Sequence, residues 1–150
     1  MQIVLHSDDI LLLEHWEKSI KEKCILIDDM EDLKNIVESL IVINYSAFNS
    51  ECKDILKSLR VSNKVLILHR TPDINTAKDL LALGAKGYGN ALMREHFIVS
   101  AIETIKEDMI WLYPEFTTML IAQIPQEQVN ENFSQLEILS SREKEVALHL

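Results

Sequence analysis

Polar side chains that could take part in chemistry stand at the ends of three apolar runs in this chain. Asp8 and Asp9 follow the first run, Asn44 ends the third and His69 follows the fourth. Carboxylates and an imidazole can hold a metal ion, and an imidazole also titrates near neutral pH. The amide of Asn44 has no anionic oxygen, so it cannot attack phosphorus to form an acyl phosphate.

Each of these residues also has a structural interpretation. Aspartate is favoured at helix N-caps, so we expect Asp8 and Asp9 to cap the next helix rather than to bind a metal ion. His69 is expected to fill its pocket and to hydrogen-bond to Asn44 or to the backbone. A pH-sensing role for His69, or a metal site shared with the two aspartates, is the alternative.

The elements that carry these residues follow from the pattern of apolar runs. Short runs alternate with amphipathic helical patterns, and this alternation predicts βα units and a parallel sheet. Continuous apolar runs are typical of strands buried on both faces. Because ligands bind at the carboxyl ends of such strands, Asp8, Asn44 and His69 should converge. The expected strands are Ile3–Leu5, Cys24–Ile27, Leu40–Ile43, Val65–Leu68 and a weak fifth strand over Lys86–Tyr88.

Five helical patterns with apolar residues three or four apart lie between and after these strands. We interpret their stripes as core faces and not as cofactor-binding surfaces, and we expect Gly84 to stop the fourth helix. The stripes are Leu12, Leu13, Trp16 and Ile20; Leu33, Ile36 and Val37; Ile55, Leu56 and Leu59; Ile74, Ala77, Leu80 and Leu81; and Phe97, Ile98, Ala101, Ile102 and Ile105.

The βα pattern ends near Asp108, and three segments are expected along the chain. Residues 1–108 form the α/β domain. Residues 109–135 contain a further helix over residues 115–122 and a polar, aperiodic linker. Residues 136–150 begin a second domain, because Ser140–Glu143 has the pattern of a helix capping box.

Composition excludes several classes of function. The net charge is −9 with no basic cluster along the sequence, so this fragment has no electrostatic footprint for nucleic acid and no DNA-binding residues are expected in it. No apolar run approaches the roughly 20 residues that cross a bilayer, and no signal peptide is recognisable. We therefore expect a cytoplasmic protein. P-loop, dinucleotide-binding and hydrolase motifs are absent, so we expect the chain to have no enzyme activity and to bind no cofactor.

Three short motifs occur in a characteristic order. Gly84–Tyr88 is similar to the turn into the fifth strand of response-regulator receiver domains, Trp111–Glu115 stands where an interdomain helix begins, and Leu139–Val146 is similar to the opening of a LuxR/NarL-type helix-turn-helix domain. The chain thus resembles a receiver domain joined to the truncated start of a DNA-binding domain. The resemblance implies a flavodoxin-like (CheY-like), doubly wound five-stranded sheet of order 2-1-3-4-5, followed by a C-terminal helical extension.

The phosphorylation pocket of receivers aligns with altered residues in this chain. Receivers use two acidic residues for Mg²⁺, an aspartate that accepts the phosphoryl group, a serine or threonine, and a lysine. The nucleophile, the hydroxyl and the lysine are all absent here, so the resemblance implies a degenerate pocket. The aligned residues are Ser7 and Asp8 (or Asp8 and Asp9 after a shift of one), Asn44, His69 and Ala91.

The resemblance implies a transcriptional regulator that works without phosphorylation. This chain would supply the regulatory part and form a homodimer, and DNA would be bound through the C-terminal domain. One alternative is a cyclic di-GMP sensor, for which Trp111 and Leu112 are present but the hydroxyl residue and arginine are replaced by Tyr113 and Pro114. Another is a protein-interaction module whose partner docks on the fourth-to-fifth-helix face.

Overall fold

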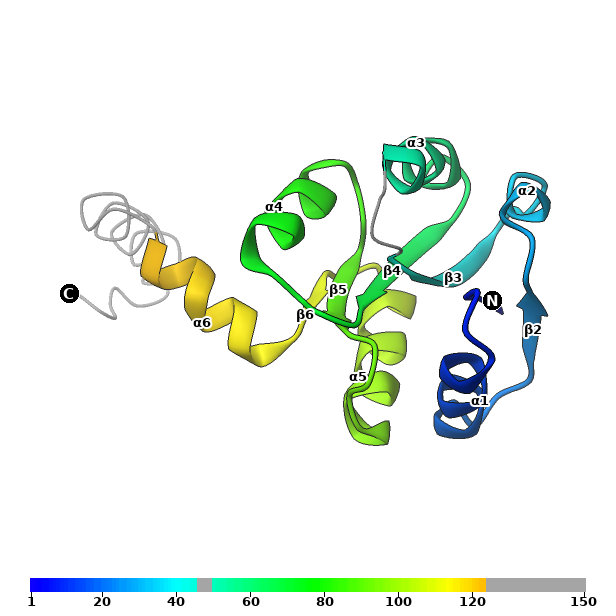
Figure 1. The fold of residues 1–150 in the computed structure, drawn as a ribbon, viewed down its shortest axis with the longest axis horizontal. Helices are drawn as coiled ribbons and strands as arrows, with labels where there is room; N and C mark the ends of the chain where they lie inside the picture. The colour runs from blue at the N-terminus through cyan, green and yellow to red at the C-terminus, as the bar shows by residue number, and fades with distance from the viewer. Residues whose placement is uncertain (46–49, 124–150) are drawn as a thin grey trace, which may run out of the picture. The chain divides into compact units, whose positions relative to one another are not determined.

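The computed structural model of this chain describes residues 1–45 and 50–123 (Figure 1). The chain divides into two compact units, Met1–Phe116 and Thr117–Leu150. The first unit contains the whole sheet and the first three residues of helix α6 (Pro114–Gln123), and residues 117–123 of that helix are the described part of the second unit. The expected helix over residues 115–122 is therefore present. The expected linker and capping box lie outside the described residues.

One parallel sheet runs through the first unit in the order β2-β1-β3-β4-β5-β6. The order 2-1-3-4-5 is confirmed, but the prediction of five strands was wrong by one. The sixth strand has only two residues, too few for a recognisable pattern. Its backbone lies so close to β5 that a Cβ atom added at Gly87 would be only 2.9 Å from the Trp111 carbonyl oxygen. The strands are β1 (Gln2–His6), β2 (Cys24–Ile27), β3 (Ser39–Asn44), β4 (Lys64–His69), β5 (Gly87–Asn90) and β6 (Trp111–Leu112).

Helices cover both faces of this sheet. Helices α1 and α5 lie on one face, and α3 and α4 lie on the other (Figure 1). Each face has its own apolar core. The core under α1 and α5, called the α1–α5 core below, contains Trp16 and Leu66, and the core on the other face contains Tyr88 and Ile67. The helices are α1 (Ile10–Ser19), α2 (Met30–Leu33), α3 (Ser50–Leu59), α4 (Ile74–Ala82) and α5 (Glu95–Lys106).

Helix α2 is shorter than its apolar stripe predicted. Leu33 is fully buried as expected, but the helix ends there, and Val37 is 59% exposed instead of facing the core. The reason lies in the next strand. Glu38 takes a positive φ of 53° and donates its N–H to the Ser62 carbonyl, which turns the chain into β3. A longer helix would leave no residues for that turn.

Helix α4 begins and ends on local signals in the sequence. The Asp73 carboxylate accepts hydrogen bonds from the N–H groups of Asn75 and Thr76, which caps the first turn. Gly84 follows the helix with a φ of 106°, a left-handed conformation that glycine adopts without strain. None of the helices in the described ranges combines the length and the apolar character needed to cross a membrane.

Candidate functional site

The carboxyl ends of β1, β3 and β4 surround an open depression of about 740 Å³. Four of the six residues singled out from the sequence line it, and its wall also contains residues that sequence reasoning did not select. Ser7 and Ala91 are buried and do not belong to the lining. The lining residues are Asp8, Asp9, Ile10, Leu11, Asn44, Tyr45, His69, Arg70 and Thr71.

Asn44 occupies the end of β3, where the chain leaves the sheet. Its side chain is almost fully buried, and its amide Nδ2 donates to Asp8 Oδ1 at 3.4 Å. Its Oδ1 atom is buried and has no hydrogen-bond partner among the described residues. An amide can stand beside Asp8 in this way because it carries no charge, whereas a carboxylate here would repel Asp8.

Asp9 is a capping residue tied to the far side of the depression. Its Oδ1 accepts from the Leu11 N–H at 2.9 Å, and its carboxylate forms an ion pair with Arg70. Partial burial raises the pKa of Asp9, but the hydrogen bonds from Leu11 and Arg70 outweigh this and hold it below its ordinary value. Ser7 Oγ accepts from the Asp9 N–H at 3.0 Å, so Ser7 also serves this turn.

His69 does not bond to Asn44 or to the backbone as expected. Its Nδ1 and the Tyr88 hydroxyl are 2.7 Å apart, and the same hydroxyl accepts from the Asp73 N–H at 3.0 Å. The Tyr88 hydroxyl therefore bridges the His69 imidazole and the Asp73 N–H, and a neutral His69 with its proton on Nε2 can accept the hydroxyl proton at Nδ1. The edge of the Tyr45 ring packs on the imidazole with 4.6 Å between centroids.

The protonation of His69 is shifted by this packing. Burial lowers the pKa of His69 below 6.5, and the nearby Asp73 carboxylate opposes this only in part. Burial also raises the pKa of the Tyr88 hydroxyl to about 12, which keeps it protonated and able to donate. The hydrogen bonds from His69 through Tyr88 to Asp73 therefore link the end of β4 and the middle of β5 to the cap of α4.

We expect this arrangement to make folding stability depend on pH. The unfolded chain binds a proton on His69 more readily than the folded chain, so stability is complete above about pH 6.5 and declines as the pH falls below it. Urea unfolding from about pH 8 to about pH 5 should show this decline. His69→Gln cannot titrate but can still accept from Tyr88, so its profile should be flatter. An unchanged slope in His69→Gln would contradict the assignment.

Ala91, which we expect to align with the lysine of receivers, lies in surroundings that leave no room for a long side chain. Ala91 is fully buried, and its N–H donates to the His69 carbonyl at 2.9 Å. Its carbonyl accepts from the indole Nε1 of Trp16 at 3.0 Å. Trp16 is also fully buried and belongs to the same apolar core. A tryptophan of α1 and the apolar core thus surround this position.

Arg70, Tyr45 and Tyr88 were missed by sequence reasoning. Arg70 follows His69 directly at the end of an apolar run, so its position could have been noticed. The pairing of Tyr88 with His69 depends on the register of β4 and β5 and had no signal in the sequence. In the part of the chain that the structure describes, no group of three or more His, Cys, Asp or Glu side chains could hold a metal ion.

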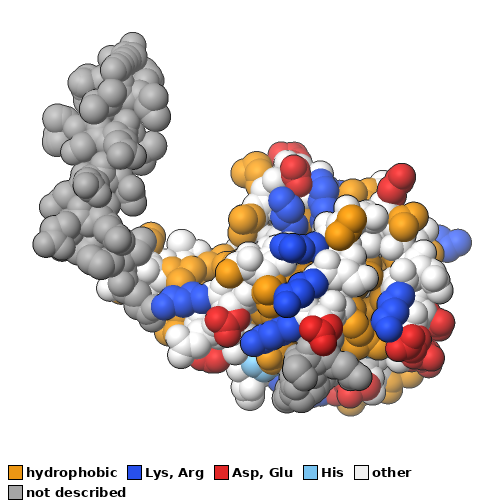
Figure 2. Space-filling view, turned by 90° about the horizontal axis from the view of Figure 1, so that it is seen from above, with side chains coloured by type: hydrophobic (Ala, Val, Ile, Leu, Met, Phe, Trp, Pro, Cys, Tyr) orange, Lys and Arg blue, Asp and Glu red, His pale blue; other side chains and the backbone are white. Residues whose placement is uncertain are grey.

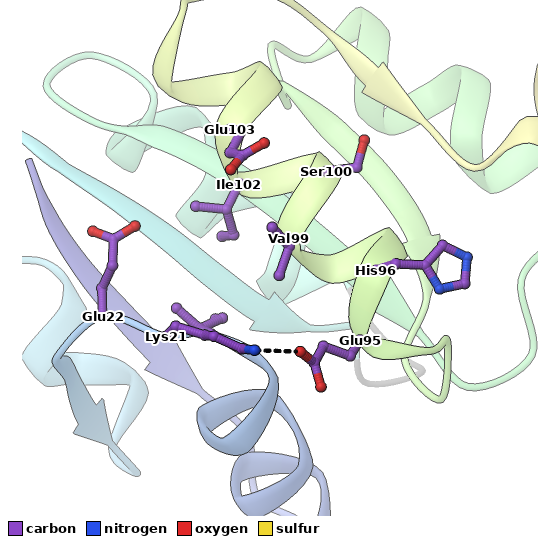
Figure 3. A pocket seen from close by; sticks show the side chains of 9 residues that line it. Lys21, Glu22, Glu95, His96, Val99, Ser100, Ile102 and Glu103 are labelled. Carbon is purple, nitrogen blue, oxygen red and sulfur yellow. Dashed lines mark ion pairs between the residues drawn. The ribbon is translucent and has the colours of Figure 1, made fainter.

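A second depression of about 460 Å³ lies between the end of α1 and the outer side of α5 (Figure 3). The aliphatic side chains of Ile20, Val99 and Ile102 form much of its wall. Lys21 and Glu95 form an ion pair of 3.1 Å at its edge, which Figure 3 marks with a dashed line. None of the six candidate site residues from the sequence lines this depression.

Basic side chains gather on the face covered by α3 and α4 (Figure 2). This gathering arises only in the folded chain, because the residues are dispersed along the sequence. Asp79 lies 3.7 Å from Lys53, and Asp108 lies 3.2 Å from Lys86, so acidic neighbours offset part of the charge. A nucleic-acid footprint needs a stronger uncompensated charge. Lys53 and Lys57 line a depression between α3 and α4, and Arg60, Lys64 and Lys86 line another near the amino ends of β4 and β5.

Comparison with known proteins defines the fold. No protein-family model and no curated protein matches the sequence. The structure is similar to a LuxR-family two-component response regulator from Aurantimonas sp. SI85-9A1, with 16% identity, a TM-score of 0.68, and coverage of 78% of this chain and 92% of that one. It is similar to the receiver domain of RcsB from Salmonella enterica serovar Typhimurium, with 13% identity, a TM-score of 0.66, and coverage of 79% and 96%.

A third similar structure comes from a different setting. The pilus assembly protein CpaE from Caulobacter crescentus CB15 matches with 17% identity and a TM-score of 0.59, covering 69% of this chain and 98% of that one. Together with the sheet order, these similarities show that the chain has the receiver-domain (CheY-like) fold. Its structural neighbours include receiver domains of LuxR-family response regulators.

Proposed function

We propose that this chain is the regulatory part of a transcriptional regulator that acts without phosphorylation. One observation carries the proposal. The side chain at the end of β3, which faces Asp8 across the depression, is the amide of Asn44 and not a carboxylate. An acyl phosphate needs an anionic oxygen as the nucleophile, and an amide does not provide one.

The neighbouring positions support the same proposal. A receiver neutralises the transferred phosphoryl group with a lysine and a metal ion, but here the lysine position is the buried Ala91. The position of the hydroxyl residue is His69, whose Nδ1 is hydrogen-bonded to the Tyr88 hydroxyl. The one arginine in the lining of the depression, Arg70, is paired with Asp9. We infer that these residues stabilise one conformation of the pocket instead of responding to phosphate.

Treatment with acetyl phosphate and Mg²⁺ tests the proposal. Intact-mass analysis should show no adduct of one phosphoryl group on the wild-type chain. An ordinary receiver domain treated in parallel is the positive control, because it forms the acyl phosphate under the same conditions. An adduct on the wild-type chain that hydroxylamine removes would show an acyl phosphate and would overturn the proposal.

The remainder of the proposed regulator follows from the sequence. Residues 1–108 would be the receiver-like domain, residues 109–135 the interdomain helix and linker, and residues 136–150 the start of a helix-turn-helix domain. DNA would be bound by that domain in a longer chain, in the cytoplasm, by a homodimer whose geometry sets the spacing of the half-sites. With a net charge of −9, residues 1–150 by themselves should not bind DNA with sequence specificity.

A protein-interaction module is the second candidate, since the pilus assembly protein CpaE shows a similar fold. A stable partner recovered on the α4–α5 face, without self-association of the chain, would favour it. A cyclic di-GMP sensor has less support from the geometry. Trp111 is 8% exposed in strand β6 and packs within the α1–α5 core, so its ring is not free to stack on a base.

A further inference from the structure

The outer edge of strand β2 is apolar and open. Strand β2 pairs with β1 on one side, and among the described residues no strand pairs with its other side (Figure 1). All four of its residues, Cys24–Ile27, are apolar. Ile25 is 40% exposed and Leu26 is 46% exposed, and they point to opposite faces of the sheet.

This edge lacks the features that normally prevent strands from pairing. Exposed edges are usually protected by charged side chains, by proline, by a bulge or by a covering element. Strand β2 contains no charge and no proline. The adjacent helix α2 has only four residues, and both central side chains of the strand remain partly exposed. The backbone donors and acceptors of the edge are therefore available to a further strand.

We propose that β2 pairs with β2 of a second copy of this chain. The two strands would run antiparallel about a twofold axis normal to the sheet, joining two sheets into one. Such an axis requires one residue to face its own counterpart, because side chains directly opposite each other lie on the same face. The candidate central residues are Ile25 and Leu26. Pairing over this length would form about four to six backbone hydrogen bonds.

The charges that flank β2 select between these two registers. With Leu26 facing Leu26 of the second copy, Lys23 lies opposite Asp29 of that copy, and the symmetry repeats this pair. With Ile25 at the centre, Glu22 would lie opposite Asp28, and these like charges would offset the attraction between Lys21 and Asp29. Opposite charges across a strand pair stabilise it and like charges destabilise it. Lys23 and Asp29 are both exposed, and the Oδ1 atom of Asp29 also caps α2 by accepting from the Glu31 N–H at 3.0 Å.

This inference deepens the homodimer of the proposed function by naming its surface. The first test is sedimentation equilibrium of the full 150-residue chain and of Leu26→Lys, which places two lysines at the axis. We expect the wild-type chain to dimerise and Leu26→Lys to raise the dissociation constant at least about tenfold. Val61→Lys is the matched control, because Val61 is 80% exposed in the loop between α3 and β4, and it should leave the constant unchanged.

A charge exchange tests the register. Lys23→Glu and Asp29→Lys should each weaken self-association about tenfold, because each brings like charges together. An equimolar mixture should recover the wild-type affinity as a heterodimer, since both pairs are then attractive. A monomeric wild-type chain, an unaffected Leu26→Lys variant, or a mixture that stays dissociated would each overturn the inference. A dimer that ignores these substitutions, together with no phosphoryl adduct, would leave the proposed function intact.

Discussion

Asn44→Asp is expected to remain unphosphorylated by acetyl phosphate in the presence of Mg²⁺. The substitution restores a nucleophilic carboxylate at the end of β3, but two other parts of the reaction are still missing. Ala91 offers no ammonium group to the phosphoryl oxygens, and His69 offers no hydroxyl and is bonded to Tyr88. Intact-mass analysis checks this, and a stoichiometric adduct on Asn44→Asp would show that the rest of the pocket is competent.

The same substitution should also destabilise the fold. A carboxylate at position 44 would be nearly buried beside Asp8 and would lose the hydrogen bond that the amide donates to it. We expect a loss of about 1–3 kcal/mol in the free energy of unfolding at neutral pH. The negative charge of Asp8 raises the pKa of the new carboxyl in the folded state. The loss of stability is therefore small below about pH 4 and grows as the pH rises.

Urea unfolding at about pH 4 and about pH 7 measures this difference. The matched control is Asn75→Asp, since Asn75 is exposed on α4 and the same change there should be nearly neutral. Equal stability of wild type and Asn44→Asp at neutral pH would mean that position 44 is hydrated and not constrained by Asp8. That result would remove the electrostatic reason for an amide at this position.

Trp16→Ala is expected to have the largest effect on stability of any substitution considered for this chain. The Trp16 side chain is fully buried in the α1–α5 core, and its Nε1 donates to the Ala91 carbonyl. Removing a buried tryptophan costs about 3–5 kcal/mol, because the core loses contacts and keeps a cavity. This is a large part of the 5–15 kcal/mol that typically holds a domain folded, at about 0.05–0.15 kcal/mol per residue.

Two variants separate the contributions of Trp16. Trp16→Phe keeps most of the ring but leaves the Ala91 carbonyl without its donor, so it should cost about 1–3 kcal/mol. Leu11→Ala removes a side chain of the same helix that is 70% exposed, and it should be nearly neutral. Denaturant unfolding gives all three values. A loss below about 1 kcal/mol for Trp16→Ala would show that the cluster around Ala91 does not depend on the indole.

The central strands of this protein are readable because they are buried on both faces. Leu40–Ile43 and Val65–Leu68 consist of apolar residues without interruption, and both are central strands. Strand β6 was not readable because two residues carry no period. Helix α2 was overestimated because Ile36 and Val37 continue its spacing, whereas the positive φ of Glu38 is fixed by the turn into β3.

The candidate site was readable to a different extent. That Asp8, Asn44 and His69 would lie at one edge of the sheet follows from the topology, and all three line the depression. Their partners do not follow from it. The bond from Tyr88 to His69 requires the register of two strands, and the ion pair of Arg70 with Asp9 joins residues from separate loops. Side-chain partners of this kind depend on tertiary structure that a local pattern does not encode.

Sedimentation equilibrium of the wild-type chain, with and without acetyl phosphate and Mg²⁺, tests the central claim most directly. The association constant should be measured over a wide range of protein concentrations in both conditions. A regulator that acts without phosphorylation predicts a dimer with the same association constant in both. A chain that is monomeric alone and becomes dimeric only with the phosphodonor would contradict the account.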